Sequence, residues 1–127
     1  MKNKGLFVLE AAVYLLLTAV PMFAHHAGGI YDRDHNLTFT GTVTEYHFTN
    51  PHVQIVFDVR DKDGNVESWT AESAPPQRLY RNGWKRNSLN PGDEITVTGA
   101  PAKDGKHLLS IRKLVGADGK VLTEGAE

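Results

Sequence analysis

Residues 37–61 constrain the fold of this chain most, because they predict two long strands bent about one corner. Over residues 53–60 apolar side chains alternate with largely polar ones, and this period of two is typical of a strand with one buried and one solvated face. Pro51 has no backbone donor for a sheet ladder, so the chain must turn there. The corner is therefore assigned to residues 49–52.

The first of the two strands changes phase along its length. From Leu37 to Val43 its apolar side chains fall on one face of the strand, with Gly41 in the same row. At Tyr46 and Phe48 they fall on the opposite face. A slip of one residue beside a glycine within a strand indicates a β-bulge and a sharp coil.

The first 24 residues have the pattern of a secretory signal peptide. A short basic start precedes an apolar run that is broken only by Glu10 and ends at Ala24. Cleavage after Ala24 would leave a mature chain of residues 25–127 in the periplasm or outside the cell. The alternative is an uncut anchor, since about 20 apolar residues span a bilayer, and a membrane partner is expected only in that case.

The charge of the mature chain is nearly balanced. Residues 1–24 hold two Lys and one Glu, so 12 basic and 14 acidic residues remain, a net charge of −2. A dedicated nucleic-acid binder is expected to carry a strong basic field, so nucleic acid is not expected as a partner. The chain has no Cys, which excludes disulfides, thiolate metal sites and Cys-based catalysis.

The rest of the chain predicts three further strands and one short helix. The strands are assigned to residues 66–72, 94–99 and 108–115, followed by a small hairpin that ends at Leu122. The helix falls between residues 73 and 83, because paired prolines at its start and a glycine just beyond its end are typical of a short helix.

This order of elements predicts a small, mainly β domain. Five strands with one short helix between the third and the fourth match an OB-like barrel, and a small β-sandwich is the alternative. The chain is divided into a signal segment at 1–24, an irregular arm at 25–36, the barrel at 37–122 and a frayed tail at 123–127.

Four motifs occur in order along the mature chain. They are His25-His26, Thr49-Asn50-Pro51-His52, Gly83-Trp84-Lys85-Arg86 and Leu89-Asn90-Pro91-Gly92-Asp93. Together they resemble a family of small exported bacterial proteins that is catalogued as domain of unknown function 6152. The resemblance implies export and one compact β domain, and it implies no activity.

The paired histidines at the expected mature start are the sharpest chemical signal. Cleavage after Ala24 would give His25 a free α-amine, so that its amine and imidazole nitrogens can chelate one metal ion. Such a chelate resembles the copper-binding histidine brace of some secreted proteins. Nitrogen-rich sites favour Cu²⁺ among first-row divalent ions, and His26 or His52 would supply a further nitrogen. The alternative is a pair of solvated histidines in a flexible arm.

A second group of histidines follows from the barrel topology. The alternation turns His47 and His52 outward beside the corner, where directly opposed side chains have Cβ atoms about 5 Å apart. In an OB-like barrel the first and fourth strand connections meet, which would bring Asn50 and both rings to Lys106 and His107. Three imidazoles would bind a metal ion, or an anion at mildly acid pH. Alternatively, His52 caps the corner through a backbone hydrogen bond, and His47 and His107 are merely exposed.

Aromatic and basic residues indicate two further surfaces. Trp69, Trp84 and Tyr80, with Asn50 on the same ligand face, would form a stacking platform for a sugar or another flat ligand, or else pack in the core. A basic patch around the helix fits either a solvated face or contact with an anionic ligand or lipid head groups. Its members are Arg78, Arg81, Lys85 and Arg86.

These features predict a periplasmic, non-enzymatic protein that binds Cu²⁺ through His25 and through His26 or His52. The alternatives are a module for a small organic or oligosaccharide ligand or a partner protein of the cell envelope, and a structural envelope protein. No nucleophile elbow or phosphate-binding glycine loop occurs. An enzyme is therefore not expected, although redox chemistry at a copper site stays open.

Overall fold

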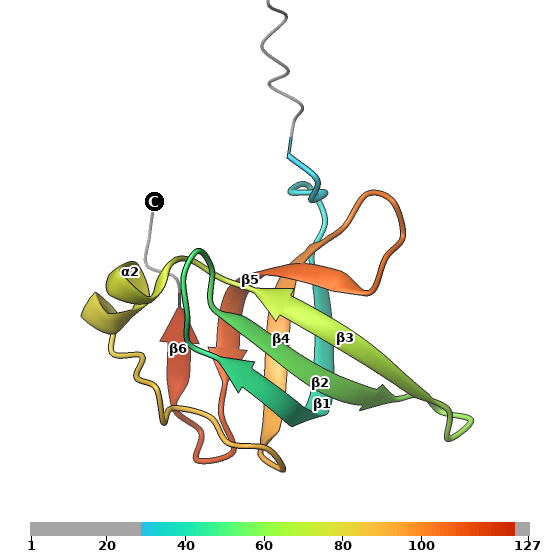
Figure 1. Ribbon diagram of the computed structural model, residues 1–127. Coiled ribbons are helices and arrows are strands. Elements are labelled where there is room, and N and C mark those ends of the chain that lie inside the picture. The colour runs from blue at the N-terminus through green and yellow to red at the C-terminus, as the bar shows by residue number, and fades with distance from the viewer. Residues whose placement is uncertain (1–28, 124–127) are drawn as a thin grey trace, which may run out of the picture.

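Six strands and one short helix make up the part of the chain that this computed structural model describes, residues 29–123. The strands are β1 (Leu37–His47), β2 (Gln54–Arg60), β3 (Val66–Glu72), β4 (Glu94–Pro101), β5 (Leu108–Val115) and β6 (Val121–Thr123), and the helix is α2 (Pro76–Arg81). Figure 1 shows α2 and the turn between β2 and β3 on opposite sides of the molecule.

The sheet closes into a barrel because β3 pairs with two neighbours. The strand order is β3-β2-β1-β4-β5-β6, and β3 also pairs with β5 in parallel. This pairing runs from Thr70 opposite Leu108 to Glu72 opposite Ser110. Closure leaves no long free edge among the first five strands. The OB-like barrel with one helix between β3 and β4 is therefore confirmed, and the sandwich alternative is set aside.

The strand β1 is the long, coiled strand that the sequence predicted. Its first half pairs with β4 and its second half with β2, and the register shifts between Val43 and Glu45. At Gly41 a Cβ atom would lie 2.5 Å from the carbonyl oxygen of Asp58 and 2.9 Å from the ring of Phe57. Only glycine therefore allows β1 to approach β2 this closely at the point where the strand coils.

Apolar side chains from all the strands meet inside the barrel, and the segment after β3 covers one end of it. Leu79 of α2 and Trp84 are fully buried, and Leu89 is 4% exposed. The hydroxyl of Tyr46 donates to the carbonyl oxygen of Lys85 at 2.9 Å, and burial raises the pKa of this phenol. The helix and the chain that follows it are thus fastened to β1 as well as to the core.

The corner between β1 and β2 is wider than the sequence predicted. Gln54, and not His52, lies opposite His47 in the register of the two strands. Phe48 and Val53 both enter the core, so residues 48–53 are all needed to turn the chain. The prediction that His47 and His52 face each other across a tight corner is therefore wrong.

The remaining strands lie close to their predicted positions. The bounds of β3 and β5 agree with the prediction, and β4 continues two residues further, to Pro101. Before β1, residues 29–36 form no strand apart from an isolated bridge between Tyr31 and Ala102. Within residues 29–123, no helix has both the length and the apolar character needed to cross a membrane.

The close approach at Gly41 predicts a large cost for any side chain there. Gly41→Ala is expected to lower the free energy of unfolding by about 1–3 kcal/mol, the range seen when a packed site is overfilled. Gly29→Ala is the matched control, because a Cβ atom there meets nothing within 4 Å. Chemical denaturation of both variants measures the difference, and equal stabilities would contradict the packing argument.

Candidate functional site

A hollow of about 360 Å³ opens beside the corner. We call it the corner hollow. Three parts of the chain form it: the arm before β1, the corner itself, and the segment that leaves β3 toward α2. Its wall consists of Ile30, Tyr31, Arg33, His52, residues 72–75, Arg78 and Ser110.

The imidazole of His52 is held in one orientation at this hollow. Its Nδ1 atom lies 3.0 Å from the backbone carbonyl oxygen of Ser73. A carbonyl oxygen only accepts hydrogen bonds, so Nδ1 must carry the proton, and in the neutral ring Nε2 then keeps its lone pair. The side chain is about half exposed. The predicted backbone hydrogen bond of His52 is therefore present, and it leaves the second ring nitrogen available to a ligand.

A carboxylate lies next to this ring. Glu72 Oε1 is 4.0 Å from His52 Nδ1, and Glu72 Oε2 accepts a hydrogen bond of 2.6 Å from the hydroxyl of Tyr31. The Glu72 side chain is 23% exposed. The hollow thus combines one imidazole, one carboxylate and one phenol, which come from three distant parts of the sequence.

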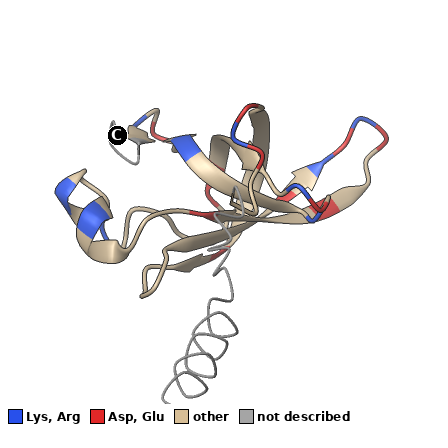
Figure 2. Ribbon diagram, turned by 90° about the horizontal axis from the view of Figure 1, so that it is seen from above, with Lys and Arg blue, Asp and Glu red and all other residues tan. Residues whose placement is uncertain are grey.

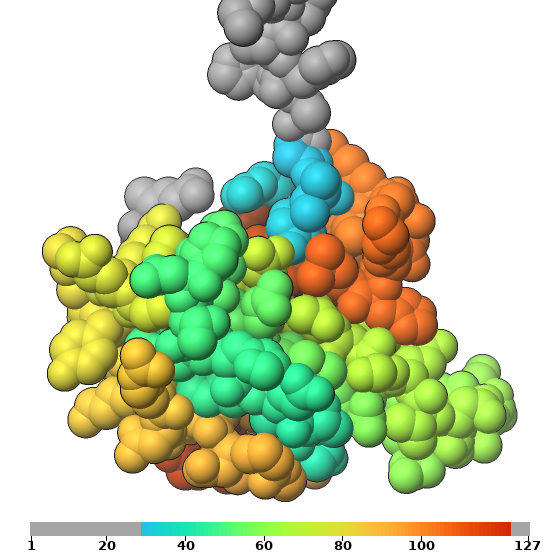
Figure 3. All heavy atoms as spheres, in the orientation of Figure 1, coloured from blue at the N-terminus to red at the C-terminus, as the bar shows by residue number. Residues whose placement is uncertain are grey.

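The arm that supplies Tyr31 is fixed to the loop after β4. The backbone of Lys103 donates to the carbonyl oxygen of Ile30 at 2.9 Å, and the backbone of Asp32 donates to that of Pro101 at 2.8 Å. Figure 3 shows these first described residues on the surface between the corner and the loop after β4. The beginning of the described chain therefore lies at the corner hollow.

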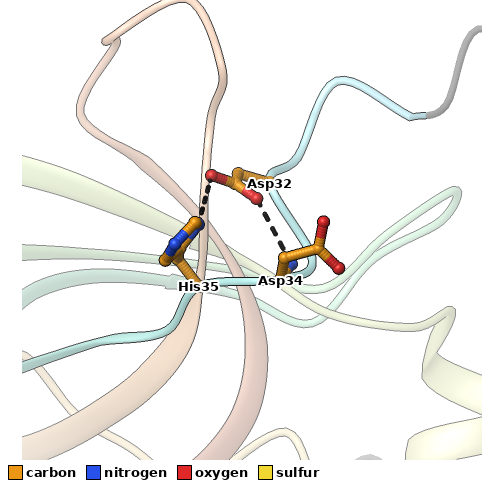
Figure 4. Close-up of polar contacts among 3 residues, drawn as sticks. All are labelled: Asp32, Asp34 and His35. Atoms are coloured by element: carbon orange, nitrogen blue, oxygen red, sulfur yellow. Dashed lines mark hydrogen bonds and ion pairs between the residues drawn. The ribbon is translucent and has the colours of Figure 1, made fainter.

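A local turn shapes the arm just after Tyr31. The carboxylate of Asp32 accepts hydrogen bonds from the backbone of Asp34 at 3.2 Å and from His35 Nδ1 at 2.8 Å (Figure 4). The hydrogen bond from His35 lowers the pKa of Asp32 below 3.8, because it stabilises the charged carboxylate.

The other predicted histidines lie elsewhere. His47 Nε2 is 2.7 Å from Glu45 Oε2 on the outside of β1. His107 stacks on Trp69, with ring centroids 4.6 Å apart, and its Nε2 atom is 3.9 Å from Glu67. Asn50 is exposed on the corner.

The three imidazoles therefore do not converge as the loop argument predicted. Over residues 29–123 no group of three or more His, Asp or Glu side chains is placed to hold a metal ion. The paired His25 and His26 lie outside the described residues.

Of the two interpretations of the aromatic residues, packing in the core is confirmed for Trp69 and Trp84, and the stacking platform is set aside. Trp84 is fully buried and Trp69 is 8% exposed, whereas Tyr80 is 65% exposed on α2. Trp69 packs between Phe39, at a centroid distance of 4.5 Å, and His107. Trp84 presents no face to a ligand, because its side chain is fully buried in the core.

Sequence reasoning missed Glu72 and Tyr31 as site residues. Glu72 was assigned only to the end of the strand at 66–72, and Tyr31 only to the irregular arm at 25–36. The only sequence signal that pointed to them was the isolated pair Ile30-Tyr31 in that arm, because their contact joins residues that are 41 positions apart.

The fold and the hollow define a small OB-like barrel domain with one polar site beside its first connection. Residues 12–109 match the model of a family of unknown function, DUF6152. The chain therefore belongs to this family, as its four motifs predicted. No curated protein matches the sequence.

Several solved structures are similar to this chain. The mitochondrial single-stranded DNA-binding protein Rim1 from S. cerevisiae is 11% identical, with a TM-score of 0.48 over 72% of this chain and 97% of Rim1. A ZRD-deleted mutant of TiaS in complex with agmatine is 23% identical, with a TM-score of 0.44 over 76% of this chain and 24% of TiaS. Apo TiaS, a tRNAIle2 agmatidine synthetase, is 19% identical, with a TM-score of 0.42 over 71% and 20% of the two chains.

The prediction that nucleic acid is excluded as a partner is contradicted. The chain forms an OB-like barrel with one helix between β3 and β4. The prediction rested on net charge, which averages the basic and acidic regions of the chain. OB-like folds bind single strands through local grooves and aromatic rings, so a balanced net charge does not exclude such a partner.

The hydrogen bond between Tyr31 and Glu72 predicts how firmly the arm is held. A hydrogen bond to a charged group contributes about 1.5–3 kcal/mol, so Tyr31→Phe is expected to speed amide exchange at Asp32 and Lys103 by about tenfold or more. Tyr80→Phe is the matched control, since Tyr80 is exposed on α2. Unchanged exchange in Tyr31→Phe would show that the arm is held without this hydrogen bond.

The pKa of Asp32 predicts a pH dependence of the arm. The pKa is lowered on folding, so the stabilising contribution is complete above about pH 3.8, the ordinary value, and is lost as the pH falls through the folded-state pKa. An NMR titration is expected to place the Asp32 pKa below 3.8, and His35→Ala is expected to raise it toward that value. A pKa that does not respond to His35→Ala would refute the assignment of its cause.

Proposed function

We propose that this protein is exported to the periplasm and binds Cu²⁺ there, without catalysing a reaction. The ligands are the α-amine and imidazole of His25 at the start of the mature chain, together with Nε2 of His52. His26 is the alternative source of the third nitrogen. The role of such a site is to bind, buffer or deliver copper.

One observation above all supports this proposal, the orientation of the His52 ring. Histidines that bind metals commonly donate their other ring N–H to a carbonyl or carboxylate, which fixes the tautomer and the direction of the lone pair. The 3.0 Å contact between Nδ1 and the Ser73 carbonyl oxygen has this arrangement. His52 is therefore ready to bind a metal ion through Nε2 without a change of tautomer.

The path of the chain supports the same copper ligands. Cleavage after Ala24 would leave four residues between the new amine and Gly29, a span of at most about 13 Å at ~3.3 Å per residue. Ile30 and Tyr31 already line the corner hollow together with His52. The α-amine of His25 would thus lie within reach of the His52 imidazole, the other part of the proposed copper site.

The hollow offers few ligands to ions that bind through oxygen atoms. Arg33 and Arg78 line the hollow beside a single carboxylate, Glu72. Such a site does not attract Ca²⁺ or Mg²⁺, which need several carboxylate or carbonyl ligands. Nitrogen ligands must supply the affinity, and among first-row divalent ions they favour Cu²⁺.

Calorimetry and electron paramagnetic resonance of the exported protein test the proposal. Wild-type protein is expected to bind one Cu²⁺ with at least two nitrogen ligands, and more tightly than Zn²⁺. His52→Ala, or one extra residue before His25, is expected to weaken binding by about tenfold or more, since even indirect supports of a metal site contribute that much. His47→Ala is the matched control, because His47 is an exposed histidine that contacts Glu45 and lies outside the hollow.

Two results would overturn the copper site. The first is an affinity no higher than that of a free His-His peptide. The second is an unchanged affinity in His52→Ala. Intact-mass analysis of the purified protein must also show His25 as the first residue, since a longer chain has no amine at this position.

A further inference from the structure

The segment from Ser73 to Gly92 has a strongly one-sided charge. It holds four Arg and Lys residues and no Asp or Glu. Residues 29–123 as a whole carry 12 basic and 12 acidic residues, so the described domain outside this segment has 8 basic and 12 acidic residues and a net charge of −4. A nearly neutral domain is therefore divided into one basic region and an acidic remainder.

The four basic side chains lie on and just after α2. Arg78 and Arg81 are in the last turn of the helix, Lys85 and Arg86 follow it, and all four are exposed. No acidic side chain within residues 29–123 forms an ion pair with any of them. Figure 2 shows the basic residues of the helix at one end of the molecule, with no acidic residue on α2. We call these four residues the α2 patch.

An exposed aromatic ring accompanies these charges. Tyr80 is 65% exposed, and it borders a shallow hollow of about 390 Å³ whose wall includes Phe48, Pro76, Arg81 and Arg86. Guanidinium groups bind phosphate oxygens in a bidentate manner, and an adjacent phenol ring suits the boundary between polar head groups and hydrocarbon. The chemistry of this surface therefore fits a phosphodiester that carries an apolar group.

We propose that the α2 patch docks this domain on a membrane surface that contains anionic phospholipids. Clusters of Lys and Arg beside an aromatic side chain are attracted to anionic bilayers, and each basic residue near the surface contributes separately. The helix projects from the edge of the barrel (Figure 2), so a flat surface can reach the patch.

A lipid surface fits better than a single strand of nucleic acid. Binding a strand takes a groove that follows several phosphates and several rings on which successive bases stack. Here Tyr80 is the one exposed ring beside the patch within the described residues, since Phe48 is 8% exposed and Trp84 is fully buried. The patch lies on a projecting helix and not in a groove.

Vesicle co-sedimentation tests the proposal. Binding to vesicles of phosphatidylcholine alone is compared with binding to vesicles that also contain phosphatidylglycerol. Wild type and all variants carry the same amino end, so any contribution of that end to binding cancels. Arg81→Gln/Lys85→Gln is expected to weaken binding to the anionic vesicles by about 25-fold, since each charge contributes about fivefold. Tyr80→Ser is expected to weaken it several-fold. High salt is expected to abolish the difference between the two vesicles.

The control variant is Lys62→Gln/Arg112→Gln, which removes the same net charge at exposed positions away from α2. It is expected to bind anionic vesicles within about threefold of wild type. Arg81 and Lys85 make no side-chain hydrogen bond or ion pair in residues 29–123, so their variant is expected to keep the fold by circular dichroism. Its affinity for Cu²⁺ is expected to be unchanged, because neither residue lines the corner hollow.

Three results would overturn the membrane proposal. The first is equal binding to both kinds of vesicle. The second is an equal loss of binding in the control and the patch variants. The third is a tighter complex with an oligothymidine strand that depends on Arg81 and Lys85 and displaces the vesicles, which would make the patch a nucleic-acid site.

Discussion

The parallel pairing of β3 with β5 is the contact on which the rest of this structure depends. It joins residues 70–72 to residues 108–110, which lie far apart in the sequence, and it converts an open sheet into a barrel. The same pairing places Ser110 and Glu72 at one edge of the corner hollow and brings His107 onto the ring of Trp69. One pairing between distant parts of the sequence therefore shapes both the site and the core. Such a pairing forms only after the chain between the paired residues has closed into a loop.

The corner hollow shows how a small barrel builds a polar site without a dedicated loop. The arm contributes the phenol of Tyr31, the corner the imidazole of His52, and the end of β3 the carboxylate of Glu72. Each of these segments is held by backbone hydrogen bonds. The backbone of Val53 donates to the carbonyl oxygen of Ala74, and the backbone of Ser73 donates to that of Val53. This exchange fixes the distance between the corner and the segment after β3, and it brings the Ser73 carbonyl oxygen to Nδ1 of His52.

Most of the fold could be predicted because its signals are local. Alternation marked the strands, glycine and proline marked the turns, and the slip in phase beyond Gly41 marked the bulge that the register shows between Val43 and Glu45. The order of the elements then sufficed for the OB-like barrel, since few arrangements of five strands and one helix are common.

The site was less predictable because it depends on register and on distant contacts. The corner was assigned four residues and takes six, since Phe48 and Val53 are both buried, and this difference separates His47 from His52. Alternation alone did not show that His107 would stack on Trp69 or that Trp84 would lie inside. The contact between Tyr31 and Glu72 could not be predicted from local pattern, because it joins residues that are 41 positions apart.

The separation of charge between α2 and the rest of the domain also affects how the molecule is oriented while it approaches a charged surface. The basic helix lies at one end of the molecule (Figure 2), so the positive charge of this end and the net negative charge of the remainder form an electric dipole. A charged surface exerts a torque on such a dipole. The protein would therefore rotate during its approach and arrive with the same side leading each time, which shortens the search for a productive encounter.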